Sequence, residues 1–236
     1  MAFDGDGTLW AGDVGEDFFH ALLREDRVLE VARPALAHEA ALAGLDSSGC
    51  AVDVARRIHE AYLAGDFLEE RMCEIVTWAS AGHTLAEIDA FAETVIASIG
   101  LPERLHGEAI SVLEWARGKG IPTFLVSASP RPIVEQAARK VGIDIACVAS
   151  AHEISSPSGV IAASVLRPIP YGAGKVIRLR EKLSARPLYA AFGDNAFDVA
   201  LLLDSQVPVA VRPKPRLVER AAEVPNLVVL ERLQTS

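Results

Sequence analysis

The stretch Phe3-Asp4-Gly5-Asp6-Gly7-Thr8-Leu9 places two carboxylates two residues apart, directly after a short apolar segment. Apolar residues that lead into an Asp-x-Asp-Gly turn indicate a buried strand with both acids at its carboxyl end, which is the end that faces ligands in an open parallel sheet. Two carboxylates in one small volume repel each other unless a cation offsets their charge. We therefore expect a hard divalent metal with oxygen ligands, and Mg²⁺ fits if phosphate shares the site.

The same stretch has two simpler interpretations. Taken alone, Asp-Gly-Asp-Gly is typical of an ordinary turn. Ca²⁺ is a weaker alternative, because the spaced acids and terminal Glu of an EF-hand loop do not follow. Only three residues precede Asp4, whereas strands usually run about five or six residues, so we expect a short first strand, as the loss of upstream residues would produce.

The bulk composition narrows the possible partners. The chain has 236 residues, of which 50% are hydrophobic, so it is long enough for one large core or for a core domain with a smaller companion. Its net charge of −9 and its lack of Lys/Arg runs argue against nucleic acid or an anionic membrane as a partner. No apolar stretch approaches the roughly 20 residues of a membrane span.

Cysteine and histidine give no sign of a disulfide framework or a zinc site. The three cysteines are far apart and none belongs to a C-x-x-C pair, so we expect small buried residues in a reducing, cytoplasmic location. The six histidines show no metal-ligand spacing either, and they are His20, His38, His59, His83, His106 and His152.

From residue 108 onward, helix-like and strand-like segments alternate. Helices are expected at residues 108–119, 132–141, 175–183 and 198–203, and strands at residues 122–126, 145–149, 160–165, 188–192, 207–211 and 227–230. This alternation is typical of βα units. It predicts an α/β fold with an open, doubly wound, Rossmann-like parallel sheet that has helices on both faces.

Residues 12–105 have a different character. They are rich in Ala, Leu and Glu with few β-branched runs, which indicates several helices, and structureless loops of that length are rare. We expect residues 12–105 to form a helical cap domain inserted after the first strand. Residues 1–11 and 106–236 would form the α/β core domain.

A second acidic motif, Gly193-Asp194-Asn195-Ala196-Phe197-Asp198, follows the expected strand at residues 188–192. Asp194 and Asp198 would again lie at the carboxyl end of a strand. Alone, the motif is equally typical of a helix N-terminus capped by Asp194 or Asn195. Together with the first cluster, it predicts a metal site assembled from two strands.

Two further residues have the context of phosphate ligands. Ser127 directly follows a strand and precedes a helix, where a hydroxyl and free backbone N–H groups suit a phosphate oxygen, although a helix-capping Ser explains it equally well. Lys175 lies at the start of a helix, where a cation opposes the helix dipole, so a ligand role is more plausible than usual. Its surroundings do not match a P-loop, because the glycine spacing differs and no Ser or Thr follows.

These four elements, in this order, resemble the haloacid dehalogenase superfamily: Asp4-x-Asp6-x-Thr8, then Ser127, then Lys175, then Gly193-Asp194-x-x-x-Asp198. The resemblance covers the whole predicted core. The position and helical character of the insert, the run Val126-Ser-Ala-Ser129 and the tail at residues 212–217 are similar to the phosphoserine phosphatase branch.

The resemblance implies phosphoryl transfer through an aspartyl-phosphate. Asp4 would be the nucleophile, and Asp6 would protonate the leaving oxygen and then deprotonate the attacking water. Ser127, Lys175 and Thr8 would belong to the phosphate site. Mg²⁺ would be held by Asp4, the backbone carbonyl of Asp6, Asp194 and Asp198, the last directly or through a neighbour. A dehalogenase is disfavoured, because those members lack an acid at the position of Asp6.

The expected substrate is a small phosphorylated metabolite, and its selection would depend on the residues around the core motifs. Asp13 and Glu16 lie just beyond the first motif, and an acid near the position of Asp13 contacts the substrate amino group in phosphoserine phosphatases. Their carboxylate-binding Arg corresponds to about Val76, and an apolar residue cannot clamp a carboxylate, so we expect another substrate. Arg71, one helical turn earlier, is a possible substitute.

Other specificity candidates are less distinctive. Trp78 and Phe67 could enclose an apolar or quaternary-ammonium group, although aromatic residues at these spacings are more often core. Arg131 flanks the phosphate motifs and is more often a surface or packing residue. The sequence also leaves open a phosphotransferase with the same aspartyl-phosphate and a non-catalytic protein that binds a phosphorylated metabolite.

Overall fold

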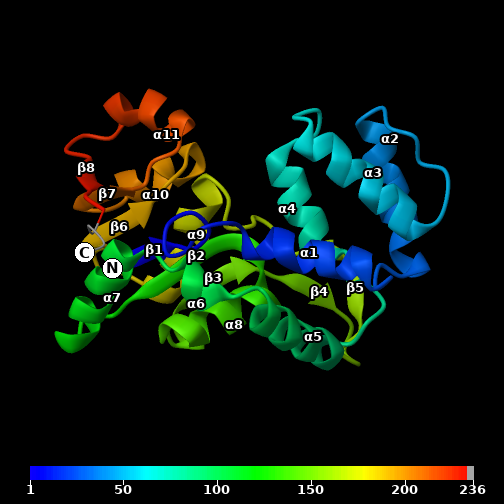
Figure 1. Cartoon of the computed structure of the whole chain (residues 1–236), viewed down its shortest axis with the longest axis horizontal. Helices are drawn as coiled ribbons and strands as arrows, with labels where there is room; N and C mark the ends of the chain where they lie inside the picture. The colour runs from blue at the N-terminus through cyan, green and yellow to red at the C-terminus, as the bar shows by residue number, and fades with distance from the viewer. Residues whose placement is uncertain (233–236) are drawn as a thin grey trace.

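The centre of the protein is a six-stranded parallel sheet, and Figure 1 shows it with helices on both sides. The structure is a computed structural model that describes residues 1–232. The strand order is β3-β2-β1-β6-β7-β8, so the order reverses on either side of β1. The six strands are β1 (Ala2–Asp4), β2 (Phe124–Pro130), β3 (Val148–Ala151), β6 (Ala190–Gly193), β7 (Val207–Val211) and β8 (Val228–Leu230). The predicted doubly wound α/β fold is confirmed.

Helices cover both faces of this sheet because the strand residues alternate between two apolar clusters. One face presents Phe3 and Phe192, whose rings stack with centroids 4.3 Å apart, toward α7 (Gly107–Gly118) and α8 (Arg131–Val141). The opposite face carries small residues such as Ala2 and Ala191 and packs against α9 (Ala173–Leu183), α10 (Val199–Leu203) and α11 (Pro215–Glu219). Every strand of the sheet centre is therefore buried on both sides, as parallel strands require.

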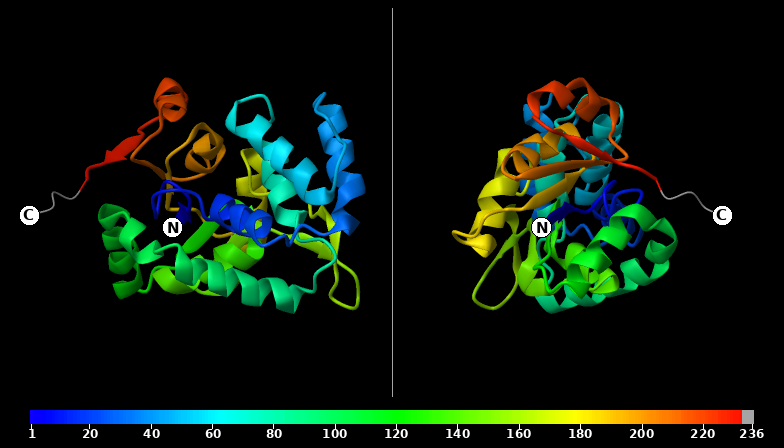
Figure 2. Two further views of the ribbon diagram at one scale, coloured as in Figure 1. Left: turned by 45° about the vertical axis from the view of Figure 1, so that its right-hand side comes forward. Right: turned by 90° about the vertical axis from the view of Figure 1, so that its left-hand side faces the viewer.

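The remaining helices come from residues 14–104. They are α1 (Val14–Arg24), α2 (Arg33–Leu42), α3 (Ala51–Leu63), α4 (Glu69–Trp78), α5 (Leu85–Ser98) and α6 (Leu101–Arg104). Helices α1 and α5 pack against α8, whereas α2, α3 and α4 gather to one side, as Figures 1 and 2 show. The expected helical character is thus present, and the assignment of residues 12–105 to a separate cap domain stays a prediction. Among the described residues, no helix is long and apolar enough to cross a membrane.

The first strand is short, as expected, with only three residues in β1. Two other expected strands differ from the structure. Residues 145–147 form a 3₁₀ turn before β3, because Asp144 accepts a hydrogen bond from the backbone N–H of Ala146 and closes a turn there.

The strand expected at residues 160–165 lies outside the main sheet. It is β5 (Ile161–Val165), which pairs in an antiparallel manner with β4 (Glu153–Ser155) in a separate two-stranded sheet. Only the first and last residues of β5 are buried, so the segment has one apolar face and could not fill a central position in a sheet covered on both sides. The backbone of Ile161 also bonds to Gly82 and His83, which lie between α4 and α5.

Candidate active site

Three strands bring the predicted site residues to one edge of the sheet. Asp4 is the last residue of β1 and pairs in register with Val126 of β2, so Ser127 follows directly beside it. On the other side of β1, Phe3 pairs with Phe192 of β6, and Asp194 follows one residue after that strand ends. Parallel strands end at a common edge, and this arrangement explains how residues far apart in sequence converge.

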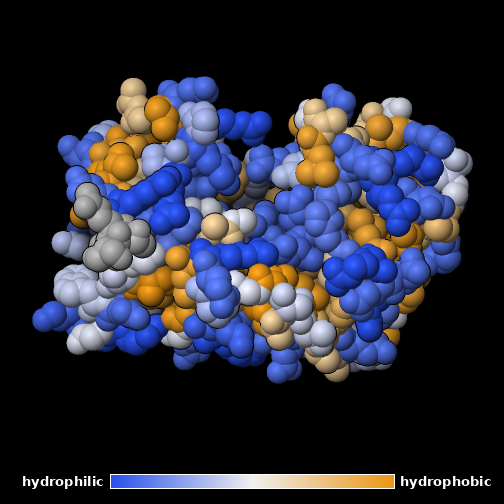
Figure 3. Space-filling model, viewed as in Figure 1, coloured by the Kyte–Doolittle hydropathy of each residue, from blue (hydrophilic) through white to orange (hydrophobic). Residues whose placement is uncertain are grey.

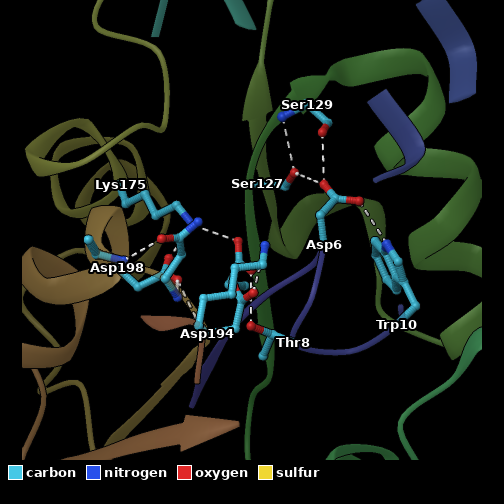
Figure 4. Close-up of polar contacts among 12 residues, drawn as sticks. Asp6, Thr8, Trp10, Ser127, Ser129, Lys175, Asp194 and Asp198 are labelled. Carbon is cyan, nitrogen blue, oxygen red and sulfur yellow. Dashed lines mark hydrogen bonds and ion pairs between the residues drawn. The ribbon is translucent and has the colours of Figure 1, made fainter. Parts of the chain in front are cut away.

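Lys175 lies between two carboxylates at the centre of this edge (Figure 4). Its side chain is 0% exposed, and its Nζ lies 2.5 Å from Asp4 Oδ1 and also pairs with Asp198 Oδ1. Burial alone would lower the pKa of Lys175, but the charges of Asp198 and Asp4 outweigh burial and hold that pKa above its ordinary value. Lys175 is therefore a permanent buried cation that compensates the acids around it.

Asp4 is a buried acid whose ionised form is disfavoured by its surroundings. Burial raises its pKa well above the ordinary range, and only part of that effect is offset by the charge of Lys175. Thr8 Oγ1 donates a hydrogen bond of 3.0 Å to Asp4 Oδ2. With one oxygen on Lys175 and the other on Thr8, the carboxylate is fixed in orientation, which is what a nucleophile requires.

Asp194 and Asp198 have different roles in the loop after β6. Asp198 Oδ2 accepts hydrogen bonds from the backbone N–H groups of Asp194 and Asn195, at 3.0 and 2.9 Å, while its Oδ1 pairs with Lys175. Asp198 is thus saturated and holds the loop. Asp194 Oδ1 has no hydrogen-bond partner among residues 1–232, and its Oδ2 lies 2.9 Å from Lys214 Nζ.

The carboxylates of Asp4, Asp194 and Asp198 fit a hard divalent cation. One oxygen of each lies within 4.8 Å of the others, and all three residues are buried. Burial, followed by the charge of Asp198, raises the pKa of Asp194 to about 6, which is the response of an acid that lacks enough compensating charge. Carboxylate oxygens are ligands that Mg²⁺ prefers, and among these three residues Asp194 offers one that has no hydrogen-bond partner.

Gly7 allows the first loop to approach Asp194. Its φ is +85°, a conformation that side chains rarely adopt, and a Cβ at this position would lie 2.1 Å from Asp194 Oδ2. The backbone of the first motif therefore lies directly against the carboxylate of the second. Any residue with a side chain at position 7 would therefore displace Asp194.

Asp6 faces away from Lys175 and is held by four donors (Figure 4). Its Oδ1 accepts from Trp10 Nε1 at 2.8 Å and from the backbone N–H of Val14 at 2.7 Å. Its Oδ2 accepts from the hydroxyls of Ser127 and Ser129, at 3.2 and 2.8 Å. The acid of the first motif is therefore coupled to the serines of β2.

A cavity opens beside Ser129, between the sheet edge and helices α1, α3 and α4. The volume open to the centre of a water-sized sphere is about 40 Å³, and Asp13, Glu16, Tyr62 and Val76 are among its lining residues. Partial burial, followed by the charge of Asp6, raises the pKa of Asp13. Part of Asp13 is exposed to solvent, which limits this rise in pKa. No Lys or Arg lines the cavity in the described part of the chain.

A wider cleft continues from this cavity and shares Glu16 and Tyr62 with it. Its other side is formed by Lys214 and Arg216, near α11. The space-filling view in Figure 3 shows a hollow between the α11 region and helices α2 to α4. The site therefore communicates with solvent between the helices of residues 14–78 and the C-terminal part of the sheet.

The structure separates three of the specificity candidates from the cavity. Arg131 pairs with Glu153 and Asp89 at 2.6 and 2.8 Å, so its guanidinium joins β4 and α5 to α8. Trp78 is buried in the core and Arg71 pairs with Glu39 and Glu74. Neither Trp78 nor Arg71 lines the cavity, whereas Asp13, Glu16 and Val76 do.

Several residues of the site were not expected from the sequence. Ser129 lies two residues after Ser127 on the same face of β2, so the period of a strand could have indicated it. Lys214 reaches Asp194 from the loop after β7, and although the resemblance includes residues 212–217, it gave Lys214 no role. Tyr62 and Cys73 come from α3 and α4, and only the packing of those helices brings them to the cavity.

Comparison with known proteins gives the class of the molecule. Residues 1–203 match the model of the haloacid dehalogenase-like hydrolase family, and this span includes all four motifs. The chain therefore belongs to that family. Comparison with curated protein sequences finds no relative.

Solved structures with the same fold include proteins of known and unknown function. A protein of unknown function from Bordetella pertussis Tohama I has a TM-score of 0.74 with 21% identity over 98% of this chain and 96% of its own. A phospho-aspartyl intermediate analogue of phosphoserine phosphatase has a TM-score of 0.57 with 15% identity over 98% and 92%. A phosphoserine phosphohydrolase-like protein from Francisella tularensis has a TM-score of 0.58 with 15% identity over 98% and 94%. At these identities, the likeness extends to the fold.

Proposed function

We propose that this hydrolase is a Mg²⁺-dependent phosphatase that cleaves a small phosphomonoester through an aspartyl-phosphate on Asp4. The observation that carries the proposal is the cluster at the sheet edge. Asp4 is oriented there by Lys175 and Thr8, next to Asp194 with its unpartnered oxygen, and Asp6 lies two residues away. A buried, oriented carboxylate beside a cation is suited to nucleophilic attack on an anionic group.

The proposed reaction has two steps on the residues of this chain. Asp4 attacks phosphorus in line, the bond from phosphorus to the leaving oxygen breaks, and the protonated carboxyl of Asp6 gives its proton to that oxygen. Water then attacks the phosphorus of the aspartyl-phosphate and loses a proton to Asp6, and inorganic phosphate leaves Asp4. Ser127 and Lys175 hold phosphoryl oxygens throughout.

Asp4, Asp194 and the backbone carbonyl of Asp6 are the proposed ligands of Mg²⁺, with Asp198 supporting them. When bound, the ion supplies positive charge that offsets the repulsion between an anionic nucleophile and an anionic substrate. The need for such charge is supported by the raised pKa values of Asp4 and Asp194, because burial destabilises their ionised forms in its absence.

The cavity beside Ser129 is the proposed place for the alcohol part of the substrate. Its ionisable acids, Asp13 and Glu16, favour an alcohol that is neutral or positively charged and oppose a carboxylate. Val76 on its wall offers no ion pair to a carboxylate. A substrate other than phosphoserine follows, in agreement with the expectation from the sequence.

Hydrolysis of p-nitrophenyl phosphate with Mg²⁺ tests the proposal. We expect turnover by the purified protein, none in excess chelator, and none by Asp4→Asn, because an amide is not a nucleophile. Asp66→Asn, at an exposed position in the loop before α4, is the matched control and should keep full activity. Full activity of Asp4→Asn, or no turnover by the unmodified protein, would contradict the proposal.

A panel of phosphoserine, phosphocholine and sugar phosphates tests the substrate class. We expect kcat/KM for phosphoserine to be below that for phosphocholine or for neutral sugar phosphates. A clear preference for phosphoserine would show that the argument from the cavity charges and Val76 is wrong. Addition of acceptor alcohols distinguishes phosphotransfer, because a transferase would form a new phosphomonoester.

A further inference from the structure

Two histidines that show no pattern in sequence meet one acid beside the cavity. Glu16 and His20 lie four residues apart on α1, so they share one face of that helix, and His59 approaches from α3. One ligand atom from each of the three residues lies within 4.8 Å of the others. The sequence expectation that the histidines form no metal-ligand spacing holds along the chain but not in space.

The geometry of this cluster approaches that of a tetrahedral metal centre. Ligand bonds of about 2.0–2.2 Å at tetrahedral angles place neighbouring ligand atoms roughly 3.3–3.5 Å apart. His59 Nε2 lies 3.3 Å from Glu16 Oε1, and the rings of His20 and His59 meet edge to face with centroids 4.7 Å apart. The ligand atom of His20 lies within 4.8 Å of the other two, and His20 is exposed, so a change of its rotamer is the adjustment that a tetrahedral centre would require.

We propose that Glu16, His20 and His59 form a second metal site, which takes a borderline divalent transition-metal ion such as Zn²⁺ and is distinct from the carboxylate site at Asp4. Two imidazoles and one carboxylate suit Zn²⁺, whereas Mg²⁺ prefers an all-oxygen set and keeps several of its waters. Three protein ligands leave a fourth position open to water.

The proposed site can be reached from solvent, and an ion bound there would change the charge of the cavity wall. Glu16 lines the cavity beside Ser129 and the wide cleft, so an ion can enter from solvent. His59 is buried against Phe19, which gives the site one preformed wall. A bound ion would join α1 to α3 and would place positive charge at the wall of the cavity.

The alternative is that Glu16 and His59 form only a hydrogen bond, with His20 as a surface residue. The two readings differ in the role of His20, because the hydrogen bond does not need it. They also differ in stoichiometry, because a second site adds one bound ion that the carboxylate site does not account for.

A calorimetric titration with Zn²⁺ in excess Mg²⁺ tests the proposal without any measurement of activity. The titration uses the tag-free protein with all 236 residues. We expect one Zn²⁺ per chain and an upward shift of Tm on binding. His20→Gln and His59→Gln should each weaken Zn²⁺ binding at least tenfold and remove the Tm shift. His38→Gln, at an exposed position on α2, is the matched control and should bind as the unmodified protein does.

Co²⁺ in place of Zn²⁺ gives a spectroscopic check, since its visible absorption reports the nitrogen ligands and the coordination number. We expect a Co²⁺ spectrum that His20→Gln alters and Asp194→Asn leaves unchanged. The proposal is overturned if no Zn²⁺ binds in excess Mg²⁺, or if binding is lost in Asp194→Asn but retained in His20→Gln. These outcomes do not depend on whether the protein is a phosphatase.

Discussion

Asp4 and Asp6 lie two residues apart, but their carboxylates have different surroundings. Asp4 is compensated by a buried cation, whereas Asp6 accepts hydrogen bonds from an indole, a backbone N–H group and two hydroxyls. Groups whose environments differ in this way are suited to separate roles in one reaction. The proposed nucleophile, Asp4, and the proposed proton carrier, Asp6, can thus be tested independently.

Asp6→Asn removes the group that we propose protonates the leaving oxygen. We expect kcat/KM, which reports formation of the aspartyl-phosphate and not its hydrolysis, to fall by about 10²–10⁴ for an alkyl phosphate, while p-nitrophenyl phosphate is less affected because p-nitrophenolate leaves without protonation. Steady-state kinetics with both substrates measures the difference. Equal losses for the two substrates would show that Asp6 acts only through the hydrogen bonds that it accepts.

Lys175→Met removes the buried cation between Asp4 and Asp198. We expect the free energy of unfolding to fall by about 3–5 kcal/mol, because two buried carboxylates lose their partner, and Mg²⁺ should restore part of that loss. Urea denaturation with and without Mg²⁺ measures both effects. Lys140→Met, at an exposed position near the end of α8, is the control, and equal stability of the two variants would contradict the expected role.

At the scale of single elements, Arg131 connects three parts of the fold. It lies at the first position of α8 and pairs with Asp89 of α5 and Glu153 of β4. The side chain of Glu153 is 2% exposed, so it depends on Arg131 for its charge compensation. Through this ion pair, Arg131, which lies near Ser127 in the sequence, holds the β4–β5 sheet against α8.

Arg131→Met separates that structural role from the substrate contact suggested by the sequence. We expect a loss of about 3–5 kcal/mol in the free energy of unfolding, because the carboxylate of Glu153 stays buried without a partner. Chemical denaturation, alongside kcat/KM at a temperature where the variant is folded, measures both quantities. Arg139→Met, exposed on the same helix, is the control. A stable Arg131→Met with a strongly raised KM would favour substrate binding instead.

The elements that the sequence predicted well are those with strong local patterns. Helices α7, α8 and α9 and strands β2, β6 and β7 follow from the apolar periodicity of their segments. The partner of β5 could not be predicted in this way, because it depends on contacts with β4 and with Gly82 and His83. Pattern alone identifies a strand but not the sheet to which it belongs.

The candidate site also contains residues whose convergence could be predicted from the sequence and residues whose convergence could not. Asp4, Asp6, Asp194 and Asp198 stand directly at strand ends or in the loop that follows, and their convergence follows from the parallel topology. The cluster of Glu16, His20 and His59 instead depends on how α1 packs against α3. Side chains that meet between helices leave no local signal, since two helices can meet at many angles and registers.

For the whole molecule, the raised pKa values of the site predict a pH dependence of stability. Asp194 is 1% exposed, and its pKa is about 6 in the folded protein, compared with an ordinary value of 3.8. The folded state therefore binds this proton more tightly than the unfolded state does. Between about pH 4 and pH 6, the contribution of Asp194 to stability is lost as the pH rises.

We expect the contribution of Asp194 to the free energy of unfolding of chelator-treated protein to fall as the pH rises from 4.5 to 6.5, with each unit of pKa shift worth about 1.4 kcal/mol. Mg²⁺ at about 100 times its Kd should add about 2.7 kcal/mol above pH 6 and less below it, because protons compete for the same oxygens. Denaturation across pH measures both trends. Asp194→Asn should flatten the first and remove the second, and an unchanged profile in this variant would contradict the argument.

The close approach of Gly7 to Asp194 has a consequence for how related chains are compared. A chain could keep every acid, the lysine and the serines of the four motifs and still lose the proposed metal site through a single added methyl group at position 7, because that group would displace Asp194. A search that counts only charged or nucleophilic residues would class such a chain as intact. Whether a relative is active is therefore decided in part by a residue that has no side chain to take part in chemistry.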